Sequence, residues 1–416
     1  MNDFTFCCPT AFVFGRGVTE RTGAELAARG HERALVVYGQ GSVVRTGTLA
    51  RILASLDEAG VAHAELGGAR PNPEVGHVRE GIAAARALGA DIILAVGGGS
   101  AIDTAKAVSA GVPLDVDVWE LFARRAEPRS QGKPAVACVL TIPAAGSEAS
   151  NSAVISNDEL CLKRGLTTEL NRPELAIMDP ELTYTLPPAQ TAAGVCDMMV
   201  HVMERYFSSE GPVPVTDNIA CGLIRALVEA GPVALADPTD YDARATIMWA
   251  GTLAHNDLAG LGRNARPFTR AGGWESHALE HELSAHDPRV THGAGLAVIF
   301  PAWLRYVWPA HPERILSFGR EVWGIEPAGA AADVAAMAPE QAAADPTVRE
   351  AALATIDELQ TFFVRLGLPR TLGELGVRAE DVPALLATLE QNKGTHIGDF
   401  QPLSLDDCRA IYESAL

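Results

Sequence analysis

The feature that most constrains the fold is a repeated pattern in the first half of the chain. Two apolar runs, 34–38 and 91–96, end in glycine turns at 39–42 and 97–99, and a helical pattern follows each turn; a third apolar run covers 135–142. Alternating strands, glycine turns and helices are typical of a parallel α/β sheet, whose ligands bind at the carboxyl ends of the strands. We therefore predict a Rossmann-like sheet with a ligand site at these turns.

The second half of the chain has a helical pattern instead. Strand-like runs disappear after the double proline at 187–188, and segments with a 3.6-residue period follow at 189–207, 214–233, 241–261, 275–285, 349–366 and 382–391. A single core stops growing at about 250–300 residues, so a chain of 416 residues is expected to form two domains. The sequence predicts an α/β dinucleotide-binding domain over 1–187 and an all-helical domain over 188–416.

The composition excludes several classes of protein. The formal net charge of −19 leaves no excess of basic side chains for a nucleic-acid backbone. The sequence contains no run of about 18 apolar residues, so no membrane span is predicted, and the first residues lack the pattern of a secretory signal. The seven cysteines are scattered and include no Cys-x-x-Cys pair, which favours buried thiols in a reducing compartment over disulfides. We expect a cytoplasmic protein.

The turn Gly97-Gly98-Gly99-Ser100 fits a phosphate cradle. Glycine lets the backbone approach an anion closely, and the start of the following helix supplies unpaired N–H groups and the positive end of a dipole. The turn matches neither named nucleotide fingerprint, G-x-x-x-x-G-K-[ST] or G-x-G-x-x-G. The alternative is an ordinary turn that requires glycine for a positive φ.

The turn after the first apolar run bears on the choice of coenzyme. Gly39 and Gly41 form it, and no acidic residue follows of the kind that binds the ribose hydroxyls of NAD. Ser42 and Arg45 lie there instead, and they suit a 2′-phosphate. We predict a preference for NADP(H), with NAD possible; the alternative is a plain surface turn.

Histidines and a carboxylate in the second half predict a metal site. Asp197 and His201 are four residues apart, which places them on one helix face; alone, such a pair is more often a buried hydrogen bond. His277 and His281 repeat the spacing, and His286 and His292 follow, so that four of the eleven histidines fall within sixteen positions. One carboxylate with two or three imidazoles suits Fe²⁺ or Zn²⁺ and leaves room for a substrate oxygen. The helical domain is therefore expected to bind metal and substrate.

Two other catalytic interpretations fail. His281 and His286 are five residues apart, whereas the zincin motif needs four. The segment Gly146-Ser147-Glu148 lacks the G-x-S-x-G elbow of a serine hydrolase and is better explained as a helix start.

Taken together, these motifs resemble the iron-containing alcohol dehydrogenase family, and within it the branch of NADPH-dependent aldehyde reductases and butanol dehydrogenases. The resemblance extends over nearly the whole chain. It rests on 2–6, Tyr38-Gly39-Gln40-Gly41-Ser42, Arg70-Pro71-Asn72-Pro73, 95–100, 140–148, 179–187, 281–285 and Thr291-His292-Gly293 with 294–297.

The resemblance implies a dehydroquinate synthase-like architecture, with metal and cofactor between the two domains. It implies that Asp197, His201, His277 and His292 bind the metal. It places the diphosphate on Gly97, Gly98, Gly99 and Ser100, and it adds Thr141, Ser147, Lys163 and Leu182 to the nucleotide site. Asp103 is implied near the nicotinamide carboxamide, Asn72 near the adenosine, and His281 near the nicotinamide ribose.

One departure from the family pattern concerns the fourth ligand. The segment between His281 and His292 is one residue longer than expected, and Asp287-Pro288 marks a loop there. His286 follows His277 by nine residues, a rotation of about 180° on a continuous helix, so it is expected to face away from the metal. We therefore expect His292 at a new helix start to be the fourth ligand.

The predicted activity is reversible hydride transfer between NADP(H) and a small aldehyde or primary alcohol, in a homodimer. His281 is expected either to pass a proton through the ribose hydroxyl or only to bind that hydroxyl. The alternative is a metal-dependent cyclase or lyase that uses NAD internally. Such an enzyme needs several lysines and arginines in the helical domain to bind an anionic sugar phosphate. Residues 189–301 contain only seven arginines and no lysine, which argues against this alternative. A non-catalytic nucleotide-binding protein leaves the metal residues unexplained.

Overall fold

The computed structural model describes residues 1–416 except 161, 209–210, 265–270, 329–333 and 335–336. The chain forms two compact units. The α/β unit contains Cys7–Pro187 and Asp237–Asn256, and the helical unit contains Met1–Phe6, Pro188–Ala236 and Asp257–Leu416.

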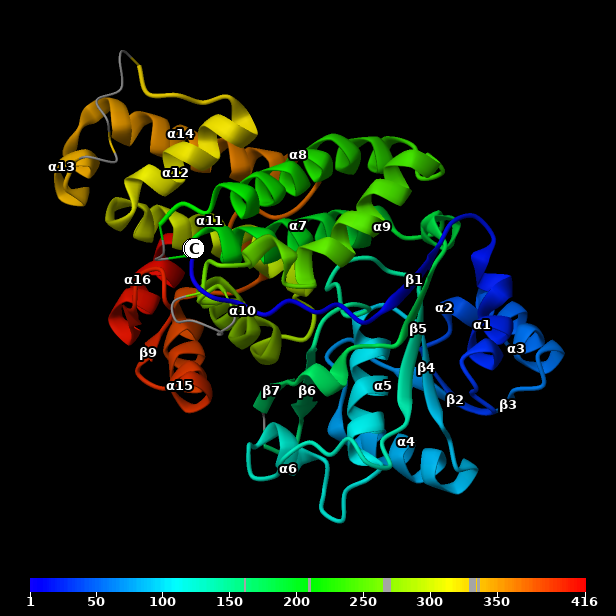
Figure 1. The fold of residues 1–416 in the computed structure, drawn as a ribbon. Coiled ribbons are helices and arrows are strands. Elements are labelled where there is room, and N and C mark those ends of the chain that lie inside the picture. Colours follow the sequence, from blue (N-terminus) through cyan, green and yellow to red (C-terminus); the bar gives the residue numbers. More distant parts are fainter. Residues whose placement is uncertain (161, 209–210, 265–270, 329–333, 335–336) are drawn as a thin grey trace. The chain divides into compact units, whose positions relative to one another are not determined.

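A six-stranded parallel sheet is the centre of the α/β unit (Figure 1). Its order is β1 (Ala11–Phe14), β8 (Leu175–Met178), β5 (Ala135–Leu140), β4 (Ile92–Gly97), β2 (Arg33–Gly39) and β3 (Ala62–Ala69). The parallel α/β prediction is confirmed, and the three apolar runs form its central strands β2, β4 and β5. The chain moves from β2 to β3 on one side and returns to β4 on the other, so the order reverses between β2 and β4.

Helices cover both faces of this sheet (Figure 1). One face packs against α1 (Thr22–Ala28) and α3 (Thr48–Glu58), and the other against α4 (Val75–Leu88) and α5 (Gly99–Gly111). Successive strand residues point to opposite faces, so β2 contributes Leu35 to one core and Val36 to the other. Both faces are therefore buried, which explains the continuous apolar runs in the sequence.

Smaller elements complete the α/β unit. They are α2 (Ser42–Arg45), α6 (Trp119–Phe122), the antiparallel hairpin β6 (Ser152–Asn157) and β7 (Leu162–Thr167), the short 3₁₀ helix η3 (Pro180–Thr183), and α9 (Tyr241–His255).

Helix α9 departs from the predicted division at residue 188. It belongs to the α/β unit because Trp249 packs edge-on against Phe12, at 5.5 Å between ring centroids, and Thr252 donates a 2.6 Å hydrogen bond to Glu148. The first six residues group with the helical unit instead. Tertiary contacts of this kind leave no periodic signal in the sequence.

The helical unit is built almost entirely of helices. They are α7 (Pro188–Tyr206), α8 (Pro214–Ala236), α10 (Glu275–His286), α11 (His292–Val307), α12 (Pro312–Phe318), α13 (Pro339–Ala344), α14 (Pro346–Arg365), α15 (Val382–Lys393) and α16 (Leu405–Ser414). A two-stranded ladder, β9 (His396–Ile397) with β10 (Leu403–Ser404), is a small exception to the all-helical prediction.

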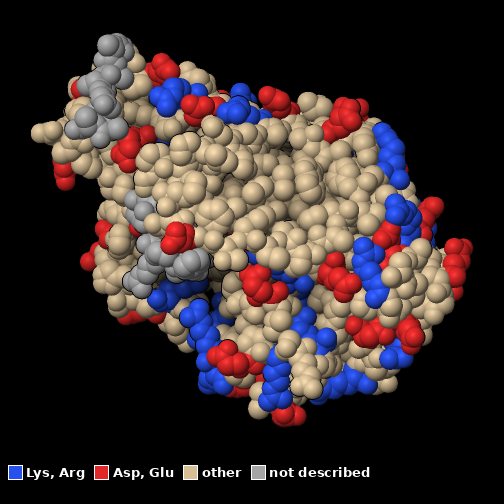
Figure 2. Space-filling model, viewed as in Figure 1, with Lys and Arg blue, Asp and Glu red and all other residues tan. Residues whose placement is uncertain are grey.

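Helix α8 is a long, apolar helix of the helical unit. By length and composition alone it could cross a membrane, with a mean hydropathy of 1.7, but core helices of soluble proteins pass the same test. It packs on α7, and only 39% of its apolar window is buried. Val215 and Val233 are 66% and 44% exposed, and Figure 2 shows a wide surface without charged side chains over this helix.

Candidate metal centre and nucleotide-binding edge

Three helices of the helical unit bring the predicted metal ligands together. Asp197 and His201 lie one turn apart on α7 and are both buried, and His277 lies in the first turn of α10. His292 is the first residue of α11. A Cβ on Gly293 would lie 2.1 Å from the Ala193 carbonyl oxygen of α7, so only glycine lets α11 begin this close to α7. This close approach places His292 beside Asp197.

The donor atoms converge on one oxygen. Asp197 Oδ1 lies 3.6 Å from His201 Nε2, 3.6 Å from His292 Nε2 and 3.9 Å from His277 Nε2. Two ligands on a tetrahedral metal with bonds near 2.1 Å are about 3.4 Å apart. The donor atoms of Asp197, His201 and His277 all lie within 4.8 Å of one another, which suits one small divalent cation, whereas His292 approaches this group through Asp197. His277 Nε2 is buried and has no hydrogen-bond partner within the described residues, as expected of a metal donor.

Two buried glutamates lie behind the histidines. Glu204 Oε1 is 3.1 Å from His277 Nδ1 and accepts a 2.6 Å hydrogen bond from Ser276. Burial alone would raise the pKa of Glu204, but its hydrogen bonds with His277 and Ser276 hold that pKa below its ordinary value. Glu280 Oε2 contacts His292 Nδ1 in the same way. Neither glutamate was predicted from the sequence, although Glu204 follows Asp197 by seven residues, which is a same-face spacing on a helix.

The structure separates His281 from His286. The His281 ring lies 5.3 Å from the His292 ring, beside the donor set. His286 is the last residue of α10, its side chain is 40% exposed, and its Nε2 lies 3.5 Å from Asp381 Oδ1. The helix continues through His286, so this histidine faces away from Asp197. Residues 287–291, where the extra residue is predicted, form the connection between α10 and α11.

The predicted glycine turns lie on either side of the point where the strand order reverses. Gly97 ends β4, and Gly98 precedes the first turn of α5. A Cβ on Gly97 would lie 2.7 Å from the Ala101 side chain, and a Cβ on Gly98 would lie 2.8 Å from the Ile142 side chain. Neither glycine has a positive φ. The alternative that this turn needs positive φ is therefore wrong, and close packing explains its glycines. At the other turn Gly41 does have a positive φ, of 123°.

The other predicted nucleotide residues belong to the same unit. Thr141 N donates to the Gly97 carbonyl at 3.0 Å, and Ser147 Oγ donates to Asp103 at 2.6 Å. Gly39 ends β2, Ser42 and Arg45 are exposed on α2, Gly99 and Ser100 begin α5, Lys163 lies on β7, Leu182 lies in η3, and Asn72 has a φ of 56° just after β3.

Lys106 is a buried cation that the sequence analysis missed. Its Nζ donates to Ser147 Oγ at 2.9 Å and to the carbonyls of Ser150 and Ser152 at 3.0 and 2.8 Å. Burial lowers the pKa of Lys106 from 10.5 to about 8. Burial also raises the pKa of Asp103, although Lys106 opposes that shift. The available signal was the three-residue spacing of Asp103 and Lys106 on one helix.

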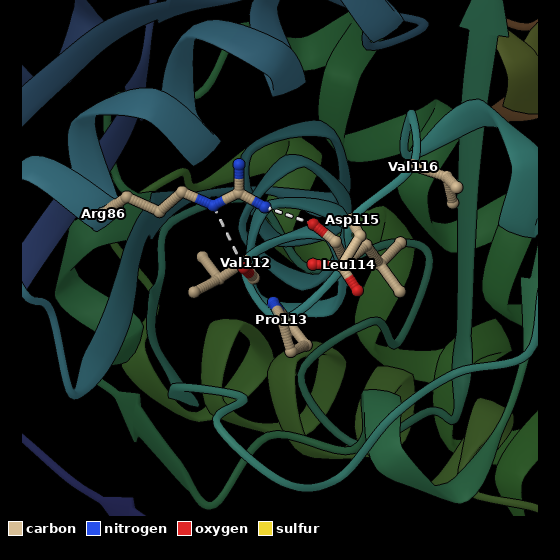
Figure 3. A pocket seen from close by; sticks show the side chains of 6 residues that line it. All are labelled: Arg86, Val112, Pro113, Leu114, Asp115 and Val116. Carbon is tan, nitrogen blue, oxygen red and sulfur yellow. Dashed lines mark hydrogen bonds between the residues drawn. The ribbon is translucent and has the colours of Figure 1, made fainter.

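A surface pocket elsewhere in the α/β unit contains none of the predicted residues. It encloses about 410 Å³ between Arg86 and residues 112–116. Figure 3 shows the Arg86 guanidinium reaching the backbone at the end of α5, and it donates to the carbonyls of Val112 at 3.0 Å and Leu114 at 2.6 Å. Arg86 therefore caps α5, and the pocket is not the candidate site.

The arginines of the helical unit do not favour the lyase alternative. Arg205 pairs with Asp257 at 3.2 Å, and Arg263 pairs with Asp217 at 2.5 Å. Both guanidinium groups are buried, and Asp217 also pairs with Arg314 at 3.2 Å, so these charges are held within the core of the helical unit. Arg266 and Arg270 lie outside the described residues.

Comparison with known proteins identifies the family of the chain. Two family models match the chain: iron-containing alcohol dehydrogenase over residues 9–180, and the C-terminal model of the Fe-containing alcohol dehydrogenase family over 191–416. Over the full length of both chains, the protein is 36% identical to NADH-dependent butanol dehydrogenase A of Clostridium acetobutylicum and 34% identical to NADPH-dependent aldehyde reductase YqhD of Escherichia coli. The crystal structure of NADH-dependent butanol dehydrogenase A from Thermotoga maritima has a TM-score of 0.90 at 32% identity, covering 100% of this chain and 99% of that one.

Proposed function

Because the chain belongs to the iron-containing alcohol dehydrogenase family, whose members use a divalent metal and NAD(P), we propose that it transfers hydride reversibly between NADP(H) and a small aldehyde or primary alcohol. The observation that carries the proposal is the convergence of three histidine nitrogens on Asp197 Oδ1 within 3.9 Å. In this proposal Asp197, His201, His277 and His292 hold one Fe²⁺ or Zn²⁺.

Each group of the donor set has a distinct task. Asp197 supplies the anion that holds a dication among neutral imidazoles. A metal held here supplies Lewis acidity to the carbonyl oxygen of an aldehyde. His281, beside the donor set, binds the nicotinamide ribose and relays a proton through its imidazole: from solvent to the product alcohol in aldehyde reduction, and from the substrate alcohol to solvent in the reverse reaction.

The carboxyl edge of the sheet binds the coenzyme in this proposal. The backbone of 97–100 receives the diphosphate at the start of α5, where N–H groups are unpaired. Asp103, fixed by Ser147, positions the nicotinamide carboxamide. The named relatives include NADH-dependent and NADPH-dependent enzymes, so the family alone does not decide the coenzyme. We assign NADP(H) because Ser42 and Arg45 lie exposed at the turn after β2 and suit a 2′-phosphate.

A cytoplasmic homodimer is part of the same proposal. Val215 and Val233 on α8 are exposed apolar side chains, and Figure 2 shows a wide uncharged surface over this helix. An exposed apolar surface of this kind is typical of one that another chain covers.

One experiment tests the reaction and the coenzyme together. The enzyme is purified anaerobically, its bound metal is measured, and a panel of short aldehydes is assayed with NADPH and with NADH. We expect one metal ion per chain. We also expect the amount of reduced coenzyme oxidised, measured by its absorbance, to equal the amount of aldehyde consumed. Turnover of a substrate without net change in nicotinamide would instead identify a lyase.

A further inference from the structure

We propose that Glu204 and Glu280 are positioning residues that set the tautomer and orientation of His277 and His292, and thereby set the affinity of the helical unit for its metal. This inference rests on the proposed function, because it takes both histidines to be metal ligands. Neither glutamate approaches the donor set as a ligand in its own right, since each contacts the ring nitrogen on the far side of a histidine from Asp197.

The geometry is the same on both helices. In His277, Nε2 points to Asp197 at 3.9 Å and Nδ1 to Glu204 at 3.1 Å. In His292, Nε2 points to Asp197 at 3.6 Å and Nδ1 contacts Glu280. An ionised carboxylate can only accept a hydrogen bond, so each Nδ1 must carry the proton. The neutral ring then presents the Nε2 lone pair to the metal.

Other contacts fix the two carboxylates. Glu204 also accepts hydrogen bonds from the Ser276 hydroxyl at 2.6 Å and from the His277 backbone N–H at 3.1 Å, so it holds the start of α10 as well as the ring. Glu280 lies against α11, where a Cβ on Gly295 would come within 2.7 Å of its Cγ. Each ligand ring is therefore oriented by a side chain that has little freedom to move.

The burial of Glu204 and Glu280 indicates that their negative charges are compensated by a nearby positive charge. Both side chains are fully buried, and one oxygen of each, Oε2 of Glu204 and Oε1 of Glu280, has no hydrogen-bond partner among the residues described. A buried charge with an unpaired oxygen destabilises a fold unless another charge compensates it. With Asp197, the two glutamates place three carboxylates around neutral imidazoles, and a dication among them supplies that compensation.

The same residues give a second cluster that needs no second metal. Glu280, His281 and His292 also lie close enough to one another to suit a cation. His292 Nδ1 already contacts Glu280 Oε2, so the proton between them occupies the donor position that a second metal would need. The cluster is better explained as residues that surround the ligands of a single metal site.

The test measures metal affinity of the whole enzyme rather than turnover. The protein is stripped with a chelator and titrated with Zn²⁺ against a chromogenic competitor, and the visible spectrum of the Co²⁺ form reports the geometry of the ligands. For both glutamates, Glu→Gln keeps an acceptor without the charge, and Glu→Leu removes the acceptor. We expect a tenfold to hundredfold weaker Zn²⁺ affinity for Leu, a smaller loss for Gln, and an altered Co²⁺ spectrum.

A matched control lies on the same helix. Glu282 is also buried, but its carboxylate accepts from Asn392 Nδ2 at 3.1 Å. Glu282→Gln should leave the Zn²⁺ affinity within about twofold of the wild type. Gly295→Ala keeps the charge of Glu280 but displaces it, and should weaken binding without removing any ligand. Circular dichroism checks that each variant is folded.

The outcomes separate the two proposals. If the wild type binds neither Zn²⁺ nor Co²⁺, the proposed function fails, and this inference fails with it. If the wild type binds one ion per chain and the folded Leu and Gln variants at 204 and 280 bind it as tightly, the metal site stands and the positioning role is refuted. Equal losses in Glu282→Gln would also refute it, because a general loss of packing would then explain the effect.

Discussion

Replacing Lys106 by methionine tests whether the buried amine stabilises the contact between α5 and residues 147–152. Lys106 lies on α5 and ties that helix to the segment after β5 through Ser147, Ser150 and Ser152. Methionine keeps most of the apolar stem and removes the hydrogen bonds that Nζ donates to these three serines. Each buried acceptor left without a donor destabilises the fold by about 1–3 kcal/mol, while the desolvation penalty of the charged amine disappears. We expect a net loss of stability at pH 7.

The pH dependence of that loss has a definite sign and size. Burial lowers the pKa of Lys106 from 10.5 to about 8, so between these values the unfolded chain binds one proton more than the folded chain. The free energy of unfolding of the wild type therefore rises with pH relative to a variant without the amine. With about 1.4 kcal/mol per pKa unit, the difference between wild type and Lys106→Met should grow by about 2.5 kcal/mol from pH 7 to pH 10.

The assay is urea unfolding of both proteins at pH 7 and pH 10, which gives the free energy of unfolding of each. The dependence of that free energy on urea concentration is compared as well as the midpoint of unfolding. A difference between wild type and Lys106→Met that stays constant or shrinks toward pH 10 would show that Lys106 keeps an ordinary pKa in the fold.

Three further predictions concern the metal and the coenzyme. Asp197→Asn should abolish metal retention and activity with the fold preserved; metal analysis that finds a full complement would make Asp197 a structural carboxylate only. His292→Ala should lose the metal and nearly all turnover, whereas His286→Ala should keep both, and the reverse result would show that the extra residue shifts the ligand register. Because a charge-assisted hydrogen bond contributes about 1.5–3 kcal/mol, kcat/KM should favour NADPH over NADH by about tenfold to a hundredfold, and Arg45→Ala should reduce that ratio. Equal use of both coenzymes by the wild type would contradict the role of Ser42 and Arg45.

The sequence predicts those elements of the fold whose burial is periodic or continuous. Strands β2, β4 and β5 are covered on both faces, so their side chains are apolar throughout and visible as runs. Strands β1 and β8 have only four residues each, and β3 lies at the sheet edge with half-exposed side chains, so none gives a clear pattern. The assignment of α9 to the α/β unit depends on Trp249 and Thr252, single contacts without a period.

The proposed metal ligands could be picked out from the sequence because histidine and aspartate in this combination are scarce and their spacing is helical. Glu204 and Glu280 have spacings just as regular, but glutamates are common on helix surfaces, and only the packing of α7, α10 and α11 shows that these two are buried. Lys106 was missed for the same reason. A lone lysine on a helix is normally exposed, and the residues that bury it follow about 40 positions later.

The predicted extra residue before His292 raises the question of which contacts determine the position of this proposed ligand. A longer loop would displace His292 if the loop alone connected it to α10. Instead, the start of α11 is fixed to α7 by the close approach of Gly293 to the Ala193 carbonyl, and the ring is fixed to α10 by the contact between Nδ1 and Glu280. Both contacts lie outside residues 287–291. A loop can lengthen by one residue at little cost in closure entropy, so the insertion changes the path between α10 and α11 and leaves the imidazole beside Asp197.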